Sequence, residues 1–229
     1  MIDLHCHSCY SDGTLSPEEV ITEALSIGLY AVAVTDHDTV NGIEIAIEAA
    51  IGKSINFVPG VEISAEIETG ALHIVGLFIN HKSPELLEML SFAEQERKKR
   101  NIKIVNRLRT IGISITTEEV EEEASPGIIG RPHFASILLR KGYVGSMEEA
   151  FLKYLAKGGA AYIPKTRIPQ SEAVSVIRKA SGIPIIAHPD QTKRGGSELS
   201  ALINQLKKHG LLGIETCYSG YSKKDIKKL

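Results

Sequence analysis

The sequence predicts an α/β protein built from β/α units around a mainly parallel sheet. Short apolar runs alternate with amphipathic stretches along most of the 229 residues, which is the pattern of strands and crossover helices. A series of successive helical stretches interrupts this alternation in the middle of the chain. We therefore expect a β/α barrel that carries a helical insertion.

Seven short apolar runs are the expected strands of this sheet. They are residues 2–5, 31–35, 57–64, 72–78, 161–164, 184–187 and 212–216.

Helix start and stop signals lie between these strands. Ser16 is an expected N-cap, Pro17 occupies the first helical position, and Glu19 completes a capping box. Further crossover helices are expected over residues 39–50 and 170–180. Gly28 and Gly182 each follow a helix and suit left-handed C-caps.

The region from 83 to 158 contains only helical patterns, over residues 84–110, 117–123, 132–141 and 146–155. Thr116 with Glu119, and Ser146 with Glu149, predict two more capping boxes. We therefore divide the chain into a barrel domain of residues 1–82 and 159–229, and a helical insertion of residues 83–158.

Bulk composition excludes several classes of protein. The apolar content of 43% and the charged content of 24% are those of an ordinary globular protein. The net charge of −2 predicts no general attraction to duplex DNA or to anionic membranes. With no secretory signal and no membrane-spanning run, a cytoplasmic protein is the simplest interpretation. The odd count of three cysteines argues against a disulfide framework, and Cys6-x-x-Cys9 has no second ligand pair at similar spacing.

Histidines and carboxylates occur where the predicted strands end. His5 and His7 alternate along the first strand, so both side chains point to the same face, and Asp12 follows closely. The further members of this set are Asp36, His37, Asp38, Glu62, His73 and His188. Because the carboxyl ends of parallel strands meet at the same edge of a sheet, we expect one shared site there.

Each residue of this set also has a purely structural interpretation. A histidine within an apolar strand, such as His73, is more often a hydrogen-bonded core residue than a ligand. Asp12 fits a turn, and Asp38 fits a helix N-cap. Glu62 is the exception, because an unpaired carboxylate inside an apolar strand is costly to bury. Taken together, the set favours a site over independent structural roles.

Imidazole and carboxylate ligands without an obvious thiolate suit Mn²⁺, Zn²⁺ or Fe²⁺. The number of ligands is sufficient for at least two metal ions. Such a site can activate water and stabilise the attacking and leaving oxygens of a phosphoester.

Basic residues supply candidate phosphate ligands. Arg131 offers a planar fork, His133 lies at the start of the same helix, and Lys165 follows an expected strand, with Arg167 nearby. The basic run from 97 to 100 could instead contact nucleic acid. Because acidic residues precede it at helical spacing, we favour a solvated helix face for this run.

Five segments occur in an order typical of one family. They are Asp-Leu-His-Cys-His-Ser, Ser-Asp-Gly-Thr, Thr-Asp-His-Asp-Thr, Gly-Val-Glu-Ile-Ser and Ala-His-Pro. They resemble the PHP (polymerase and histidinol phosphatase) family of metal-dependent phosphoesterases. The resemblance implies a distorted, TIM-like (β/α)7 barrel with three divalent metal ions. The helical insertion resembles the stand-alone branch, whose members hydrolyse nucleoside 3′,5′-bisphosphates or trim short RNA from the 5′ end.

The resemblance also implies a role for each candidate residue. Glu62 would bridge metal ions, Asp36 would orient an imidazole, and Arg131 and His133 would face the substrate phosphate. One ion would be bound by His5 and His7, a second by Asp12 and His37, and a third by His73 and His188. The expected catalytic residues are His5, His7, Asp12, His37, Glu62 and His188. Lys165 joins Arg131 and His133 as an expected substrate ligand.

The late Asp-x-His motif of the family does not occur in this chain. The sequence stops at Leu229 within an amphipathic segment that would lead to the last strand. We therefore expect a fragment whose barrel is completed beyond Leu229.

The predicted activity is hydrolysis of phosphomonoesters of a small nucleotide, or of the 5′ end of short RNA, by a metal-activated hydroxide. Mn²⁺ is the preferred ion, with Zn²⁺ or Fe²⁺ as alternatives, and we expect a monomer. Histidinol-phosphate phosphatase is the same chemistry on a different substrate. A non-catalytic metal- or nucleotide-binding domain is the alternative from another class.

Overall fold

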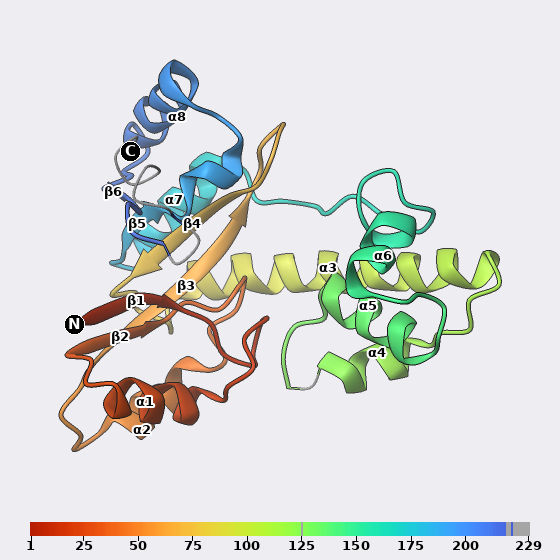
Figure 1. Ribbon diagram of the computed structural model, residues 1–229. Helices are drawn as coiled ribbons and strands as arrows, with labels where there is room; N and C mark the ends of the chain where they lie inside the picture. The colour runs from red at the N-terminus through yellow and green to blue at the C-terminus, as the bar shows by residue number, and fades with distance from the viewer. Residues whose placement is uncertain (125, 219–220, 222–229) are drawn as a thin grey trace.

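The computed structural model describes residues 1–124, 126–218 and 221 (Figure 1). Its centre is a six-stranded sheet in which the strands follow one another in chain order. They are β1 (Ile2–Cys6), β2 (Ala31–Val34), β3 (Asn56–Ala65), β4 (Leu72–Leu77), β5 (Ile183–Ile186) and β6 (Gly213–Ile214). The described residues thus supply six strands, and the seven implied by the family resemblance stay a prediction.

Strand β4 corrects the expectation of a mainly parallel sheet. The pairs β1–β2, β2–β3 and β5–β6 are parallel, whereas β4 is antiparallel to both β3 and β5. The reason is the short link between β3 and β4, residues 66–71, which contains no crossover helix. A parallel neighbour requires such a crossover, so two strands joined by a short link form a hairpin. The fold is a mixed α/β fold.

The expected strand over residues 161–164 is wrong. This segment begins a linker that runs to residue 169, and the linker's only pairing with the sheet among the described residues is an isolated bridge between Ile168 and Ala65. The carbonyl of Ile163 accepts a hydrogen bond from Nε of Arg100 instead of from a neighbouring strand. Apolar content alone did not distinguish a strand from a linker whose backbone bonds with side chains.

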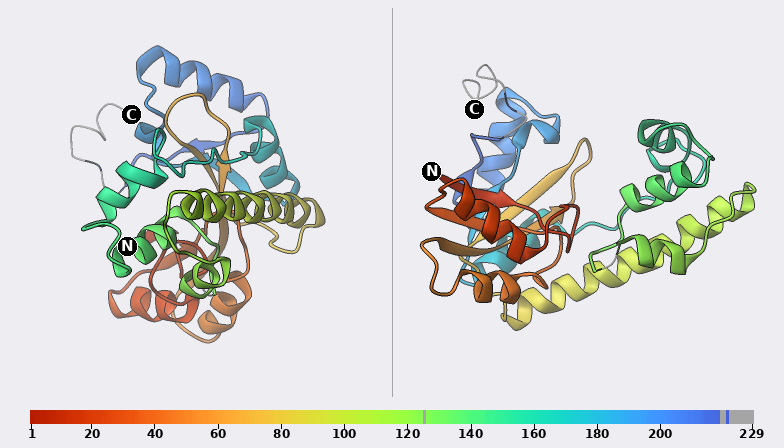
Figure 2. Two further views of the ribbon diagram at one scale, coloured as in Figure 1. Left: turned by 90° about the vertical axis from the view of Figure 1, so that its right-hand side faces the viewer. Right: turned by 60° about the horizontal axis from the view of Figure 1, so that its bottom comes forward.

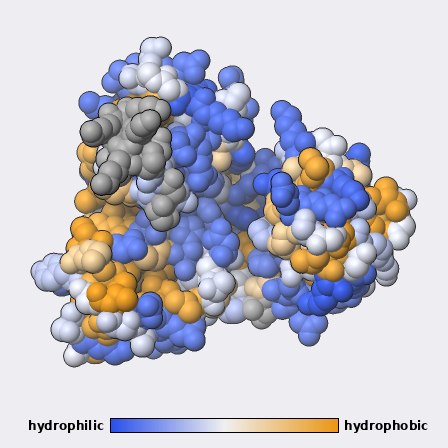
Figure 3. All heavy atoms as spheres, in the orientation of Figure 1, coloured by the Kyte–Doolittle hydropathy of each residue, from blue (hydrophilic) through white to orange (hydrophobic). Residues whose placement is uncertain are grey.

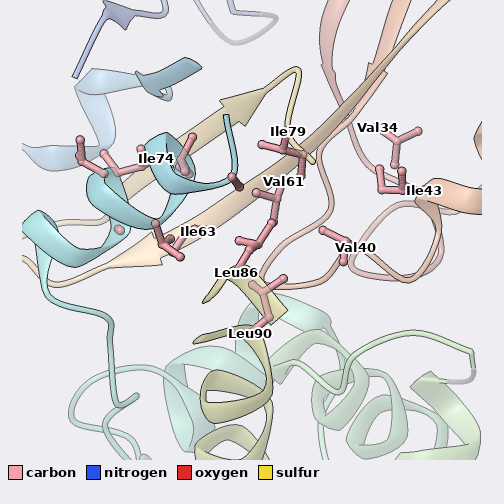
Figure 4. Close-up of a cluster of buried hydrophobic side chains, with 14 of the residues drawn as sticks. Val34, Val40, Ile43, Val61, Ile63, Ile74, Ile79, Leu86 and Leu90 are labelled. Atoms are coloured by element: carbon pink, nitrogen blue, oxygen red, sulfur yellow. The ribbon is translucent and has the colours of Figure 1, made fainter. Parts of the chain in front are cut away.

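Helices α1 (Pro17–Ser26), α2 (Ile43–Ala50), α7 (Gln170–Lys179) and α8 (Gly196–Lys207) enclose the core of the sheet. Figure 4 shows part of this core, where Val61 and Ile63 of β3 lie on the side of Leu86 and Leu90 of a further helix. All four of these side chains are buried. Removal of this apolar surface from water is the main stabilisation of the fold.

Local signals set most helix ends as predicted. Ser16 Oγ accepts a hydrogen bond from the Glu19 N–H, and Glu19 accepts one from the Ser16 N–H, which forms the expected capping box. The box of Thr116 and Glu119 is also present. At Ser146 only half of the box forms, because Glu149 accepts from the N–H of Gly145 instead.

Two expected helix ends are wrong. Helix α2 begins at Ile43 rather than near residue 39, so Asp38 does not cap it. Gly28 adopts the expected left-handed conformation with φ +73°, but after α7 this conformation falls on Ser181, with φ +62°. Gly182 serves close packing, because a Cβ atom there would lie 2.7 Å from a side-chain carbon of Ile79.

A helical lobe projects from the sheet (Figure 2). It contains the C-terminal half of α3 (Pro84–Thr110), then α4 (Thr117–Ala124), α5 (Arg131–Arg140) and α6 (Met147–Ala150), which continues into the π-helical turn η1 (Phe151–Leu155). These helices surround a separate apolar cluster that includes Leu108, Phe134 and Leu138. The order of helices follows the prediction, and α3 has the predicted bounds.

The sheet curls into a half-barrel. Its first and last strands approach each other, because His5 at the end of β1 lies 3.0 Å from Glu215, which follows β6. A cavity of about 270 Å³ separates these two edges along their length, lined by residues such as Leu4, Val75 and Ile214. Within the described part of the chain, no helix combines the length and the apolar character needed to cross a membrane.

Candidate metal centre

Glu62 of β3 is the centre of a histidine cluster at the mouth of the half-barrel. Its side chain is fully buried. Five imidazoles surround the carboxylate, four from the ends of β1, β2 and β5 and one from β4. The nitrogen–oxygen distances are 2.8 Å for His188, 3.0 Å for His37, 3.1 Å for His7, 3.1 Å for His73 and 3.4 Å for His5. The structure therefore brings these six predicted ligands together.

Asp12 joins the cluster at its exposed side. Its Oδ1 atom lies 2.7 Å from Nδ1 of His7, and its Oδ2 atom lies 3.7 Å from Nε2 of His37. A tight loop makes this possible. A Cβ atom on Gly13 would lie 2.2 Å from the carbonyl oxygen of His7, so only glycine fits there.

Two sets of three ligand atoms have the spacing of metal sites. One set consists of His5, Glu62 and His188, and the other of His7, His37 and Glu62, each with its atoms within 4.8 Å of one another. Glu62 belongs to both sets, as a bridging carboxylate would.

Missing hydrogen bonds support this assignment. In the described part of the chain, Nδ1 of His37 and Oε2 of Glu62 are buried and lie 3.0 Å apart, but neither atom has a hydrogen bond of acceptable geometry. Buried polar atoms are normally paired, so unpaired nitrogen and oxygen atoms that converge on one space fit metal ligation. The residues thus suit the divalent ions that the ligand chemistry predicts.

The charges of the cluster support each other. Burial opposes ionisation of Glu62, but the surrounding imidazoles outweigh it and hold the pKa of this carboxyl well below its ordinary value. Although burial opposes protonation of His7, the Asp12 and Glu62 carboxylates raise its pKa to about 10. Burial also opposes protonation of His5, but the Glu215 and Glu62 carboxylates raise its pKa to about 9. Contact with His7 lowers the pKa of Asp12 to about 2.

Asp36 does not orient an imidazole directly. Its buried carboxylate accepts hydrogen bonds from Ser8 N–H at 2.7 Å, Ser8 Oγ at 2.6 Å and Ser11 Oγ at 2.6 Å. Ser11 Oγ in turn lies 3.4 Å from Nδ1 of His7. Asp36 therefore fixes the loop that carries His7 and Asp12.

Glu215 is a member of the cluster that the sequence interpretation missed. One of its oxygens lies 3.0 Å from His5, and the other accepts a 2.6 Å hydrogen bond from the N–H of His188. The available signal was the same as for the others, since Glu215 lies at the end of a predicted strand.

The predicted substrate ligands lie in the helical lobe and the linker rather than within the histidine cluster. Arg131, at the start of α5, donates to the carbonyl of Leu155 at 3.3 Å. Nδ1 of His133 accepts the N–H of Gly130 at 2.9 Å and so caps the same helix. Lys165 pairs with Asp38 at 2.9 Å. Figure 3 shows that hydrophilic residues line the cleft between the sheet and the helical lobe.

The basic run on α3 is only partly a solvated face. Lys98 and Lys99 are exposed and pair with Glu94 and Glu96 at 2.7 Å each. Arg97 and Arg100 turn inward, and Arg100 is only 7% exposed. Helical spacing explains the difference, since residues three apart share a face. The expectation is therefore wrong for the two arginines.

A curled α/β half-barrel with a buried carboxylate surrounded by five histidines is the kind of site that metal-dependent hydrolases use. The family model of the PHP domain matches residues 3–162. The chain therefore belongs to the PHP family, as the resemblance of its five sequence segments suggested. It is a metal-dependent phosphohydrolase.

Curated relatives match over nearly the whole chain. The chain is 36% identical to a 5′-3′ exoribonuclease of Haemophilus influenzae, over 96% of this chain and 80% of the relative. It is 35% identical to 5′-3′ exoribonuclease Rnm of Escherichia coli, over 90% and 71%. It is also 35% identical to a 3′,5′-nucleoside bisphosphate phosphatase of Chromobacterium violaceum, over 99% and 80%.

Solved structures have the same fold. An amidohydrolase from Chromobacterium violaceum, solved with bound sulfate and no metal, superposes with a TM-score of 0.90 at 35% identity, covering 99% of this chain and 80% of the other. A protein from Bifidobacterium adolescentis assigned as a metal-dependent phosphoesterase superposes with a TM-score of 0.87 at 27% identity, covering 100% and 81%.

Proposed function

We propose that this protein hydrolyses phosphomonoesters of small nucleotides such as nucleoside 3′,5′-bisphosphates, or the 5′ end of short RNA. The observation that carries this proposal is the pair of ligand sets that share Glu62. The relatives named as a nucleoside bisphosphate phosphatase and as exoribonucleases support the substrate class.

Up to three divalent ions per complete site, with Mn²⁺ preferred and Zn²⁺ or Fe²⁺ possible, are part of this proposal. The donor set of imidazole nitrogens and carboxylate oxygens supports it, because neither ligand set of the described residues contains a thiolate. When bound, such ions supply activation of water and neutralisation of charge on the phosphate. Asp12, 3.7 Å from His37, and His73, 3.1 Å from Glu62, would supply two further ligands, with His73 and His188 proposed for the third ion.

The protein residues have distinct tasks in this reaction. Glu62 and the histidines hold the ions at fixed separation, and Asp36 holds the loop of His7 and Asp12 in place. With its pKa lowered to about 2, Asp12 stays ionised at neutral pH on the exposed side of the site.

Arg131, His133 and Lys165 are the proposed substrate ligands. Among the described residues, the Arg131 guanidinium makes one hydrogen bond, from Nη1 to the carbonyl of Leu155. Its other N–H groups can therefore donate to a phosphate. His133 has its Nε2 atom available after Nδ1 caps the helix. The sulfate found in the metal-free Chromobacterium violaceum structure supports anion binding by protein residues in this family.

Duplex DNA has no place in the proposal. The net charge is −2, and the exposed Lys98 and Lys99 are each paired with a glutamate. Duplex binding normally depends on many unpaired basic groups that neutralise phosphates.

A comparison of substrates tests the proposal. The protein is loaded with Mn²⁺, and phosphate or nucleotide release is measured with adenosine 3′,5′-bisphosphate, a short 5′-phosphorylated RNA and histidinol phosphate. Preferred turnover of either nucleotide supports the proposal. Preferred turnover of histidinol phosphate, or binding of metal without any turnover, would replace it by one of the two alternatives that the sequence left open.

A further inference from the structure

Asp38 lies beside the metal centre but belongs to neither ligand set. It is 2% exposed and has a φ of +55°, a conformation that is uncommon for residues other than glycine. Its N–H donates to the carbonyl of Glu62 at 2.9 Å. Its carboxylate accepts from the N–H of Ser64 at 2.8 Å and from Ser64 Oγ at 3.1 Å. Both bonds fix Asp38 against the strand of the bridging carboxylate.

The position of Ser64 places this carboxylate at the mouth of the half-barrel. Ser64 and Glu62 are two residues apart on β3, so their side chains point to the same face. Residues two apart on a strand are separated by roughly 7 Å. Asp38 is thus held a short distance from the carboxylate at the centre of the histidine cluster.

Two cations share the single carboxylate of Asp38. Nζ of Lys165, in the linker, lies 2.9 Å from Oδ2, and the Arg97 guanidinium, on α3, contacts the same oxygen. The Lys165 side chain is 25% exposed and the Arg97 side chain is 12% exposed. Burial lowers the pKa of Lys165 to about 8, against the attraction of Asp38, which leaves it mostly protonated at neutral pH. The group therefore carries an excess positive charge.

Donors remain in this group after the pairing. Nε of Arg97 is buried without a hydrogen-bond partner in the described part of the chain. The Lys165 ammonium has three donors, and its one hydrogen bond to a described residue is with Asp38. If these contacts served only to attach α3 to the sheet, one cation paired with Asp38 would be enough. A structural role alone therefore does not explain the second cation or the unpaired Nε of Arg97.

Further positive charge and open space adjoin the pair. Arg100, one helical turn after Arg97, is buried and has no carboxylate within 4 Å among the described residues. Burial and the charges of Arg131 and Arg97 lower its pKa to about 10. Asp38 and Arg97 also line a cavity of about 540 Å³, so there is open space beside the pair.

We propose that Arg97 and Lys165, held by Asp38, form an anion subsite beside the metal centre for the phosphate of the substrate that is not hydrolysed. This rests on the proposed function in one respect, since it assumes a substrate with two phosphates. The subsite explains why one carboxylate is shared by two cations. It also explains how binding energy from a remote phosphate could select doubly phosphorylated nucleotides over singly phosphorylated ones.

Binding to the chelator-treated protein tests the subsite without the contribution of metal ions. Calorimetry measures the affinity for adenosine 3′,5′-bisphosphate and, as a reference without phosphate, for adenosine. We expect the wild type to prefer the bisphosphate. Lys165→Met and Arg97→Met should each weaken bisphosphate binding at least about tenfold, the loss of one charge-assisted contact. Each variant leaves one cation paired with Asp38, so neither creates an unpaired buried carboxylate.

Lys99→Met is the matched control, because Lys99 is a neighbouring cation on α3 that faces solvent, pairs with Glu96 and does not line the cavity beside Asp38. It should bind the bisphosphate with the affinity of the wild type. Equal affinities of the wild type for adenosine and the bisphosphate, or unchanged bisphosphate affinity in both methionine variants, would overturn the subsite.

Turnover by the Mn²⁺-loaded protein separates this proposal from the proposed function. If the loaded wild type hydrolyses no nucleotide while the binding pattern holds, the proposed function fails and the subsite stands. If nucleotides are hydrolysed but the variants bind the bisphosphate as the wild type does, the subsite alone fails.

Discussion

Nδ1 of His5, at the end of the first strand, lies 3.0 Å from Oε1 of Glu215, which follows the last described strand. The other oxygen of Glu215 accepts the N–H of His188. One carboxylate thus orients two ligands that the chain brings from its opposite ends.

Glu215→Gln should therefore weaken metal binding. Outer carboxylates that orient ligating histidines typically contribute about 10–100-fold to affinity. Metal content after dialysis against graded chelator concentrations measures the change. Glu198→Gln, at an exposed position on α8, is the control. Equal metal retention in both variants would show that Glu215 has no such role.

Glu62→Gln should abolish hydrolysis while the protein stays folded. The amide keeps the volume of the side chain but cannot bridge two cations, so the rate should fall by at least about 10²-fold, as when a central electrostatic contact is removed. His5→Ala should have an effect in the same direction. Nucleotide turnover with saturating Mn²⁺ gives the rate, and circular dichroism checks the fold. Normal turnover in either variant would contradict the site.

Metal binding should release protons. In the chelator-treated protein the pKa of His5 is raised to about 9 and that of His7 to about 10, so both are protonated at pH 7. Ligation needs the neutral imidazole, and the ions must displace these protons. We expect metal affinity to rise as the pH increases from 6.5 toward 9. Calorimetric titration in buffers with different ionisation enthalpies counts the protons, and a count near zero would refute this account.

Gly13→Ala should disturb the loop that brings His7 and Asp12 together. The new methyl group would lie 2.2 Å from the carbonyl oxygen of His7, and overpacking of this kind costs about 1–3 kcal/mol. Thermal unfolding and metal titration should both show the loss. Gly195→Ala is the control because nothing lies within 4 Å of the added Cβ atom. Similar behaviour of the two variants would mean that the loop adjusts without cost.

The convergence of most candidate metal ligands was predictable because they lie at strand ends with a distinctive neighbourhood. His37 follows a run of small apolar residues, and Glu62 interrupts one. Their convergence then follows from sheet geometry, with no need for long-range detail. Glu215 had the same placement, but it lies outside the five segments that carry the family resemblance.

The remaining features depend on contacts that no local pattern specifies. The antiparallel direction of β4 follows from a link too short for a helix. The inward side of α3, with Arg97 and Arg100, follows from which face meets the linker. The pairing of Lys165 with Asp38 joins residues 127 positions apart. Long-range pairings of this kind become visible only when the chain is folded.

Helix α3 belongs to two apolar cores at once. Leu86 and Leu90 lie in the core of the sheet, and Ile104 and Leu108 lie in the core of the helical lobe. A continuous helix between two cores acts as a rigid rod, since bending it breaks successive backbone hydrogen bonds. The lobe and the sheet should therefore open to hydrogen exchange as one cooperative unit, and slow motion at the active site should come from the linker rather than from the helix.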